Sequence, residues 1–321
     1  MKLLANLISM ACAMVCTAVL AQSYPSKPIR MVVPDGGGGP DVTARIISPQ
    51  IQANIGQPVI VENRPGANSI IGSEIVAKSA PDGYTWLITT TAFAANPSIY
   101  KKLPYDSIND FTPITQVTEV EALIVTVPAA SPARTLRDLV AEAKKPGAKL
   151  SYGSPGIGNI MHLAGALFQT RAGIEMLHVP YKGTAPAVQA LMSNEIQMMI
   201  APAIVVQGSL QVGKMRALAY THRSRAAAFP DMPTTAEAGV AGVEIDGGWL
   251  GMFAAAKTPP EIVNRIQTEI RKSFDDAKTR ERILALSIMP IGSRPEEFRK
   301  LVISQIARYA ELAKLANIEP E

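Results

Sequence analysis

The feature that most constrains the fold is a short apolar strand that runs into four consecutive glycines and then into a helical pattern. The strand pattern covers residues 29–33, and the glycines are followed by Pro40. A glycine loop between the end of a strand and the start of a helix can offer its backbone N–H groups to an anion. We therefore predict a carboxylate-binding loop, although a tight structural turn explains the glycines equally well. The predicted binding residues of this loop are Gly36, Gly37, Gly38, Gly39 and Asp41, and Asp41 is also the expected N-cap of the helix.

The strand and helix patterns alternate after this loop, with further strands predicted at residues 59–62 and 85–89. Such alternation predicts a parallel sheet covered by helices on both faces. Ligands of these sheets bind beyond the carboxyl ends of the strands. The third strand ends in a run of threonines, so we add Thr89, Thr90 and Thr91 to the predicted binding residues.

The pattern of strand, glycine-rich loop and helix recurs in the second half of the chain. A β-rich run at 114–127 precedes it, which we interpret as a crossover between two lobes. The second loop, residues 153–159, is predicted to face the first glycine loop across a cleft. The candidate binding residues from this half are Ser154, Gly156, Gly158, Asn159, His162 and Tyr181.

Several kinds of chemistry are weighed against this binding role. The first glycine loop lacks the Gly-Lys-Ser/Thr ending of a phosphate-binding loop, and Asp41 stands where a dinucleotide fingerprint needs glycine. The hydrolase elbow Gly-x-Ser-x-Gly is not met around Ser154, because Tyr152 takes the place of its first glycine. Ser154 is then either a hydroxyl donor to a ligand or an ordinary loop serine. His162 either faces the cleft or has a structural role. The rival functional class is a secreted hydrolase that uses Ser154 and His162. Separately, Trp249 either lies at the hinge, where its emission would report closure, or is an ordinary core residue.

The composition limits the kinds of metal, cofactor and macromolecule that the chain is expected to bind. Residues 1–21 combine Lys2 with an apolar run and resemble a secretory signal peptide. Both cysteines, Cys12 and Cys16, lie in this segment, so the mature chain is predicted to contain no disulfide and no cysteine-ligated metal. The net charge of +4 falls to 4 − 1 = +3 without Lys2, and without Lys/Arg runs a nucleic-acid partner is not expected. The three histidines lack metal-ligand spacing, and no cofactor motif is present.

Six motifs spread over nearly the whole mature chain carry a family resemblance. They are YPSKPIR at 24–30, GQPVIVENRPGA at 56–67, APDGY at 80–84, NPSIY at 96–100, HVPYKG at 178–183 and FPDMPT at 229–234. As a set, they resemble the Bug family, the periplasmic receptors of tripartite tricarboxylate transporters. At the first glycine loop the chain departs from this family, because Asp35 replaces the usual aromatic residue. An inward-facing Asp35 opposes anion binding, so either it faces outward or the ligand is not a simple dicarboxylate.

The resemblance implies an α/β fold of the two-lobed, type II-like periplasmic binding protein class, with a parallel-rich sheet in each lobe. We expect lobe 1 at 22–122 and 249–321, and lobe 2 at 123–248. The implied function is capture of a small organic carboxylate, aliphatic or aromatic, and its delivery to a membrane permease, without catalysis. A receptor that reports the ligand to a signalling partner is the alternative within binding. The resemblance places the ligand at residues 34–41, 89–91 and 153–159, and we expect a monomer.

Overall fold

The computed structural model describes residues 24–226, 229–245, 247–286, 288–315, 318 and 320. The predicted signal peptide at 1–21 lies outside these residues. Within the described ranges, none of the helices has the length and apolar character required to cross a membrane.

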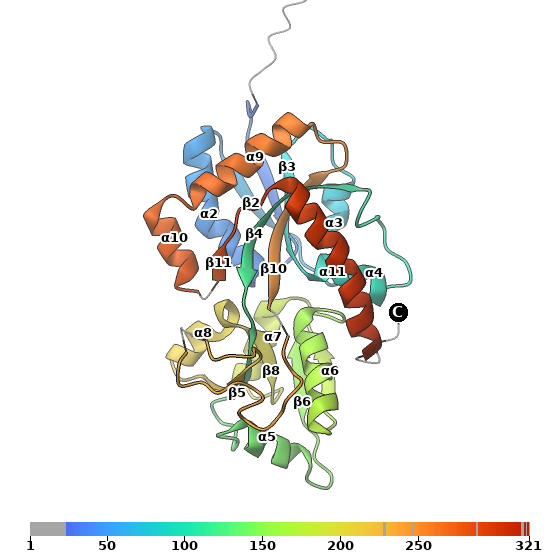
Figure 1. The fold of residues 1–321 in the computed structure, drawn as a ribbon, viewed down its shortest axis with the longest axis vertical. Coiled ribbons are helices and arrows are strands. Elements are labelled where there is room, and N and C mark those ends of the chain that lie inside the picture. Colours follow the sequence, from blue (N-terminus) through green and yellow to red (C-terminus); the bar gives the residue numbers. More distant parts are fainter. Residues whose placement is uncertain are drawn as a thin grey trace, which may run out of the picture.

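A six-stranded sheet forms the larger unit of the molecule (Figure 1). Strands β1, β2 and β3 pair in parallel, as the alternating pattern predicts, whereas β10 is antiparallel to both β3 and β4. The six strands, in spatial order, are β11 (Ile288–Pro290), β4 (Phe111–Val120), β10 (Gly248–Ala255), β3 (Thr85–Thr90), β1 (Ile29–Val33) and β2 (Val59–Asn63).

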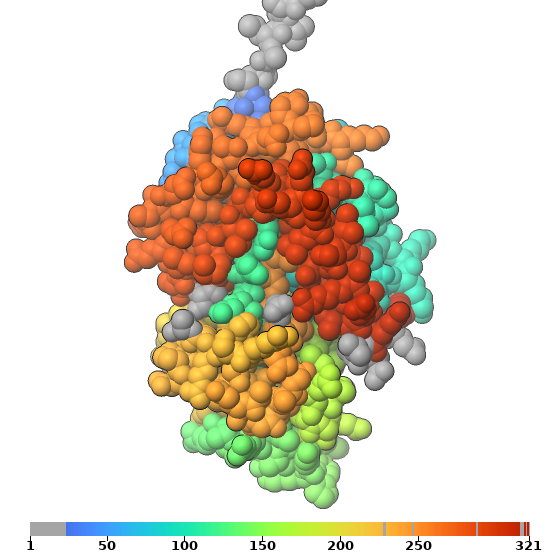
Figure 2. All heavy atoms as spheres, in the orientation of Figure 1, coloured from blue at the N-terminus to red at the C-terminus, as the bar shows by residue number. Residues whose placement is uncertain are grey.

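Helices cover both faces of this sheet, because its central strands are apolar on both sides. On β1, Met31 belongs to the core on one face and Val32 to the core on the other. The first face packs against α2 (Gly39–Ile55), α9 (Pro260–Ser273) and α10 (Ala277–Leu284), and the second against α3 (Ile70–Ala77), α4 (Ala92–Ile99) and α11 (Pro295–Leu315). In the space-filling view, α11 (red) runs down the larger unit toward the smaller one (Figure 2).

The smaller unit is built on a three-stranded sheet in which β5 (Leu123–Pro128) lies between β8 (Met199–Pro202) and β9 (Met215–Tyr220). Both pairs are antiparallel. A separate parallel pair joins β6 (Ser151–Ser154) and β7 (Leu177–Pro180). This unit is therefore more antiparallel than predicted, because a continuous apolar run indicates a buried strand without indicating its direction.

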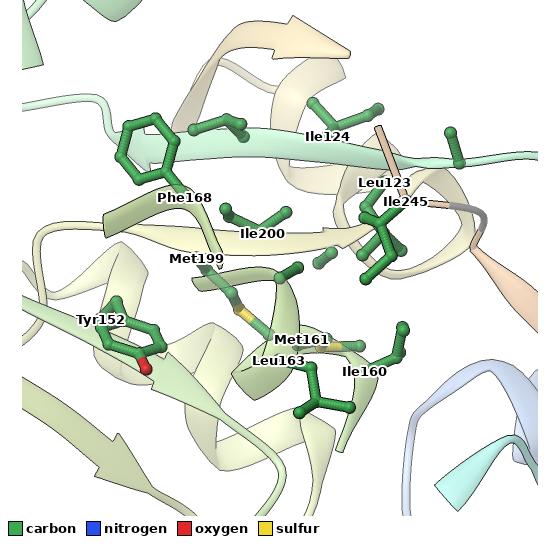
Figure 3. Packing of buried hydrophobic residues seen from close by; sticks show 14 of the residues in the cluster. Leu123, Ile124, Tyr152, Ile160, Met161, Leu163, Phe168, Met199, Ile200 and Ile245 are labelled. Carbon is green, nitrogen blue, oxygen red and sulfur yellow. The ribbon is translucent and has the colours of Figure 1, made fainter. Parts of the chain in front are cut away.

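Four helices complete the smaller unit and close its core. They are α5 (Leu136–Ala143), α6 (Ile160–Ala172), α7 (Thr184–Met192) and α8 (Ala203–Gln211). Figure 3 shows Leu123 and Ile124 of β5, Ile200 of β8 and Phe168 of α6 among the buried residues of this core. The chain first passes between the two sheets at residues 121–122, within the β-rich run predicted as a crossover.

Candidate functional site

A cavity lies between the two units, at the carboxyl ends of β1 and β3. It contains about 730 Å³ of space between atoms, part of it open to solvent. Its walls combine residues of the larger unit, such as Thr91 and Trp249, with residues of the smaller unit, such as Asn159 and Thr184.

Six helices begin at the wall of this cavity. Each contributes its N-cap or first-turn residues to the lining: Gly39 and Pro40 of α2, Ser69 of α3, Thr91 of α4, Asn159 of α6, Gly183 and Thr184 of α7, and Pro202 of α8. The first N–H groups of a helix have no partner within it, and the helix dipole places partial positive charge at that end. The convergence of six N-termini therefore creates a site for an anion.

The first glycine loop differs from its prediction at the start of α2. The N-cap is Gly38, not Asp41, because the fixed φ of Pro40 suits the first turn of a helix and allows α2 to begin earlier. Asp41 lies in that first turn. Its carboxylate accepts hydrogen bonds from the Gly37 N–H (3.3 Å) and from Arg45 Nε (3.0 Å). Asp41 thus holds the loop in shape, as predicted, but by a different contact.

Gly39 is the predicted residue of this loop that lines the cavity. Gly36, Gly37, Gly38 and Asp41 do not contribute to the described wall. Of the glycines and acidic residues of this loop, Gly39 and Asp35 are therefore the ones that line the cavity.

Asp35 turns toward the smaller unit rather than outward. Its Oδ2 accepts a hydrogen bond from Thr184 Oγ1 at 2.8 Å, and its Oδ1 accepts one from the Thr184 N–H at 3.2 Å. Gly38 makes room for this contact, since a Cβ at that position would lie 2.0 Å from Asp35 Oδ2. Burial raises the pKa of the Asp35 carboxyl above its ordinary value, although the Thr184 hydrogen bonds act in the opposite direction.

Both glycine loops reach the cavity, but each makes its direct contact with a different segment of the opposite unit. The first loop meets residues 183–184, where Asp35 contacts Thr184. The second loop instead approaches Asn68 of the larger unit, and a Cβ on Gly156 would lie 3.6 Å from the Asn68 Cβ. The turn after β7 carries a single glycine, Gly183, so its part in the site left a weak signal in the sequence.

The threonine run at the end of β3 meets the cavity as predicted. Thr90 and Thr91 line it, whereas Thr89 is fully buried and its Oγ1 has no hydrogen-bond partner among the described residues. Thr91 is also the N-cap of α4. Both the side chains and the helix start therefore face the same space.

Asn159 is the predicted residue of the second loop that lines the cavity. Its Oδ1 accepts a hydrogen bond from the Met161 N–H at 3.0 Å, so it also caps α6. Gly156 and Gly158 shape the backbone of this loop with φ of 153° and 75°. A Cβ on Gly158 would lie 2.4 Å from a side-chain carbon of Ile99, which makes glycine necessary there.

The histidines behind this loop form a structural stack in which His162 is buried and His178 is partly buried. His162 Nδ1 accepts a hydrogen bond from the Gly158 N–H at 3.0 Å, and its ring stacks on His178 with centroids 3.8 Å apart. His178 Nε2, not His162, is the ring nitrogen that contacts Ser154 Oγ, at 2.7 Å. Burial lowers the pKa of His162 to about 4, and burial beside His162 lowers that of His178 to about 3.

These contacts do not support the rival hydrolase. The predicted partner of Ser154 was His162, but the serine bonds to His178 and lies fully buried. An imidazole with so low a pKa is a poor general base near neutral pH. Neither histidine contributes to the described cavity wall, and neither does Tyr181, whose ring lies beside Gly153.

Trp249 is the main cavity residue that the sequence did not identify as a ligand contact. It is buried, and its Nε1 donor has no hydrogen-bond partner among the described residues. A buried donor without a partner is costly, and a ligand or water in the cavity can supply the acceptor. The flanking Gly247, Gly248 and Gly251 were the available signal. Asn68 and Ser69 were also missed.

Metal binding has no support in the part of the chain that the structure describes. No group of three or more His, Cys, Asp or Glu side chains lies close enough there to hold a metal ion.

Comparison with known proteins identifies the family. The model described as the tripartite tricarboxylate transporter family receptor matches residues 43–318. A protein of Pseudomonas sp. (strain P51), described as the UPF0065 protein in the tcbD-tcbE intergenic region, is 38% identical and is matched over 95% of this chain and 92% of its own length. Protein BugT of Bordetella pertussis is 32% identical over 96% of this chain and 94% of its own length.

Solved structures agree with this assignment. The periplasmic binding protein BugD superposes with a TM-score of 0.87 at 33% identity, covering 93% of this chain and all 100% of BugD. A protein of R. palustris solved with adipate has a TM-score of 0.88 at 32% identity, covering 93% of this chain and 100% of that one. MatC from Rhodopseudomonas palustris, with bound malate, has a TM-score of 0.84 at 28% identity, covering 90% and 99%.

The resemblance to Bug receptors and the predicted α/β binding-protein fold are thus confirmed. The family consists of solute-binding receptors and not of enzymes, which excludes the hydrolase. This chain belongs to the tripartite tricarboxylate transporter receptor family and has the fold of its periplasmic binding proteins.

Proposed function

We propose that this receptor captures a small organic carboxylate in the cavity between its two units and delivers it to the membrane permease of a tripartite tricarboxylate-type transporter. Solved relatives carry adipate and malate, which supports the ligand class. The family supports the membrane partner. Export to the periplasm through residues 1–21 and a monomeric state are part of the proposal.

The observation that carries the proposal is the convergence of six helix N-termini on the cavity. Among the described residues that line it, none carries a basic side chain. The ligand carboxylate is therefore held by neutral donors and helix dipoles rather than by an ion pair. The Trp249 Nε1–H and the side chains of Thr91 and Asn159 are the donors that we assign to it.

The two units act as the lobes of a clamp in this proposal. We assign residues 22–122 and 249–321 to lobe 1 and residues 123–248 to lobe 2. Lobe closure would bury the ligand between Thr91 on one side and Asn159 on the other, and would present a changed surface to the permease. A receptor that reports the ligand to a signalling partner would use the same cavity, and deletion of the permease separates the two roles by testing uptake.

The test is titration calorimetry of the mature chain with adipate, malate, citrate and benzoate. We expect at least one acid to bind with one-to-one stoichiometry, and no chemical change in the recovered ligand. Binding by none of these acids would contradict the proposed ligand class.

Asn159→Asp sharpens the test, because aspartate also caps a helix and so preserves the start of α6. The added negative charge in the cavity should lower the affinity for a carboxylate at least tenfold, since the repulsion between two like charges about 4 Å apart costs about 4 kcal/mol at an intermediate dielectric. Asn264→Asp adds the same charge on the exposed side of α9 and is the matched control. Equal affinity in both variants would place the ligand elsewhere.

A further inference from the structure

The Asp35 carboxylate lies at the N-terminus of α7, where a bound anion would otherwise lie. Its carboxylate accepts the N–H and the hydroxyl hydrogen of Thr184, the first residue of α7. These are the donors that a helix N-terminus offers to a bound carboxylate. One of the six N-termini at the cavity is thus already satisfied by the protein.

A glycine on each side of the Asp35–Thr184 contact makes room for it. Gly38 lacks the Cβ that would displace Asp35 Oδ2, and Gly183 precedes α7 with a φ of 119°, where a side chain would be strained. A Cβ on Gly183 would also lie 3.4 Å from Asp35 Oδ1. Two glycines therefore hold the carboxylate of one unit against the helix start of the other.

The charge of the cavity wall should make the region near Asp35 reject a second carboxylate. Of the described residues that line it, Asp35 alone has an ionisable side chain. No described lysine, arginine or histidine in the wall offsets a second negative charge near it. A carboxylate group brought close to Asp35 would meet repulsion in a partly desolvated space.

The rest of the wall still accommodates one carboxylate. Ser69, Thr91 and Asn159 stand at the starts of three other helices, and Trp249, whose Nε1–H has no partner among the described residues, also lines the wall. We propose that Asp35 takes the place of the second carboxylate of a dicarboxylate, so that the receptor selects monocarboxylates with an uncharged far end. This inference rests on the proposed function and names its ligand class more narrowly.

The experiment compares acids of equal length that differ in one end. Calorimetry at about pH 8, where carboxyl groups are ionised, measures the affinities of adipamate against adipate and of succinamate against succinate. We expect the wild-type chain to bind the amide-ended member of at least one pair tenfold or more tightly than its dicarboxylate. Tighter binding of the dicarboxylate in every pair would overturn the inference and leave the proposed function intact.

Asp35→Asn tests the residue itself. Asparagine has nearly the same shape and can still accept the Thr184 hydroxyl hydrogen, so the fold should persist. The preference for the amide-ended acid should fall at least tenfold. Asp82→Asn removes an exposed carboxylate in the turn before β3, at the opposite end of that strand, and should leave the preference unchanged.

An unchanged ratio in a folded Asp35→Asn chain would overturn the assignment to this residue. If this variant does not fold, the wild-type ratio alone decides the ligand class. Failure of all four acids to bind the wild-type chain would overturn this inference. It would contradict the proposed function as well only if malate, citrate and benzoate also fail to bind.

Discussion

At the residue scale, His162 and His178 link the stability of the second loop to pH. Their folded pKa values, about 4 and about 3, lie below the ordinary value of 6.5 for histidine. At a pH between the folded and the unfolded pKa of each histidine, the unfolded chain binds more protons than the folded chain. The free energy of unfolding therefore falls as the pH drops from about 6.5 toward 4, by up to about 1.4 kcal/mol per pH unit for each histidine.

His178→Gln removes one of these titrations, and the glutamine amide can still hydrogen-bond to Ser154 Oγ. We expect the loss of stability between about pH 6.5 and 4.5 to be smaller in the variant, with a slope reduced by about one proton. Urea denaturation at a series of pH values measures it. His222→Gln, on an exposed turn, is the control. Equal slopes in the wild type and His178→Gln would contradict a partly buried imidazole that stays neutral in the folded chain.

At the element scale, the sequence predicted best those parts whose signal is local. The strands β1 to β3 were visible as apolar runs separated by helical patterns, and their parallel order follows from the connections between them. The first residue of α2 was missed because Pro40 favours a start before Asp41. The antiparallel pairs of β5 were missed because its partners come from distant parts of the chain.

The candidate site shows the same division. Gly39, Thr90, Thr91 and Asn159 were predicted because each lies where a strand ends and a helix begins. Asn68, Ser69 and Trp249 were not predicted as contacts, because their place at the cavity depends on how the two units pack. The partner of Asp35 likewise required the structure, since 149 positions separate it from Thr184.

The packing of α11 on β10 depends on one glycine. A Cβ on Gly251 would lie 2.0 Å from Phe298 Cζ, and that ring is fully buried. Gly251→Ala should force the ring or the helix to move and lower the free energy of unfolding by about 1–3 kcal/mol. Gly208→Ala in α8, where no atom lies within 4 Å of the added Cβ, should instead be neutral or stabilising. Denaturation curves for both variants test this, and equal stability would contradict the close approach.

At the scale of the whole molecule, Trp249 joins the cavity to the core of the larger unit. It packs edge-on against Phe298 of α11, with ring centroids 5.2 Å apart, and also lines the cavity. Trp249→Phe keeps the aromatic ring and removes the Nε1–H donor. Since a hydrogen bond to a charged group contributes about 1.5–3 kcal/mol, the affinity for the acid that binds should fall roughly ten- to a hundredfold.

The stability of Trp249→Phe should fall less than that of Trp86→Phe, because both variants lose the packing of the larger ring but the Trp249 Nε1 has no partner within the described protein to lose. Trp86→Phe is the matched control. Trp86 is equally buried, but its Nε1 donates to the Gly83 carbonyl, so this change should lower stability and leave affinity unchanged. Calorimetry and thermal denaturation measure the two effects, and unchanged affinity in Trp249→Phe would remove Trp249 from the ligand contacts.

The central claim is that a carboxylate binds in the cavity between the two units. Trp86→Phe leaves Trp249 as the only tryptophan of the chain, so the tryptophan emission of this variant comes from a residue in the cavity wall. Titration of this variant with adipate, adipamate, malate, citrate and benzoate tests the claim most directly. We predict a saturable change in Trp249 emission that is complete at one equivalent of at least one acid. Unchanged emission with every acid would contradict the claim.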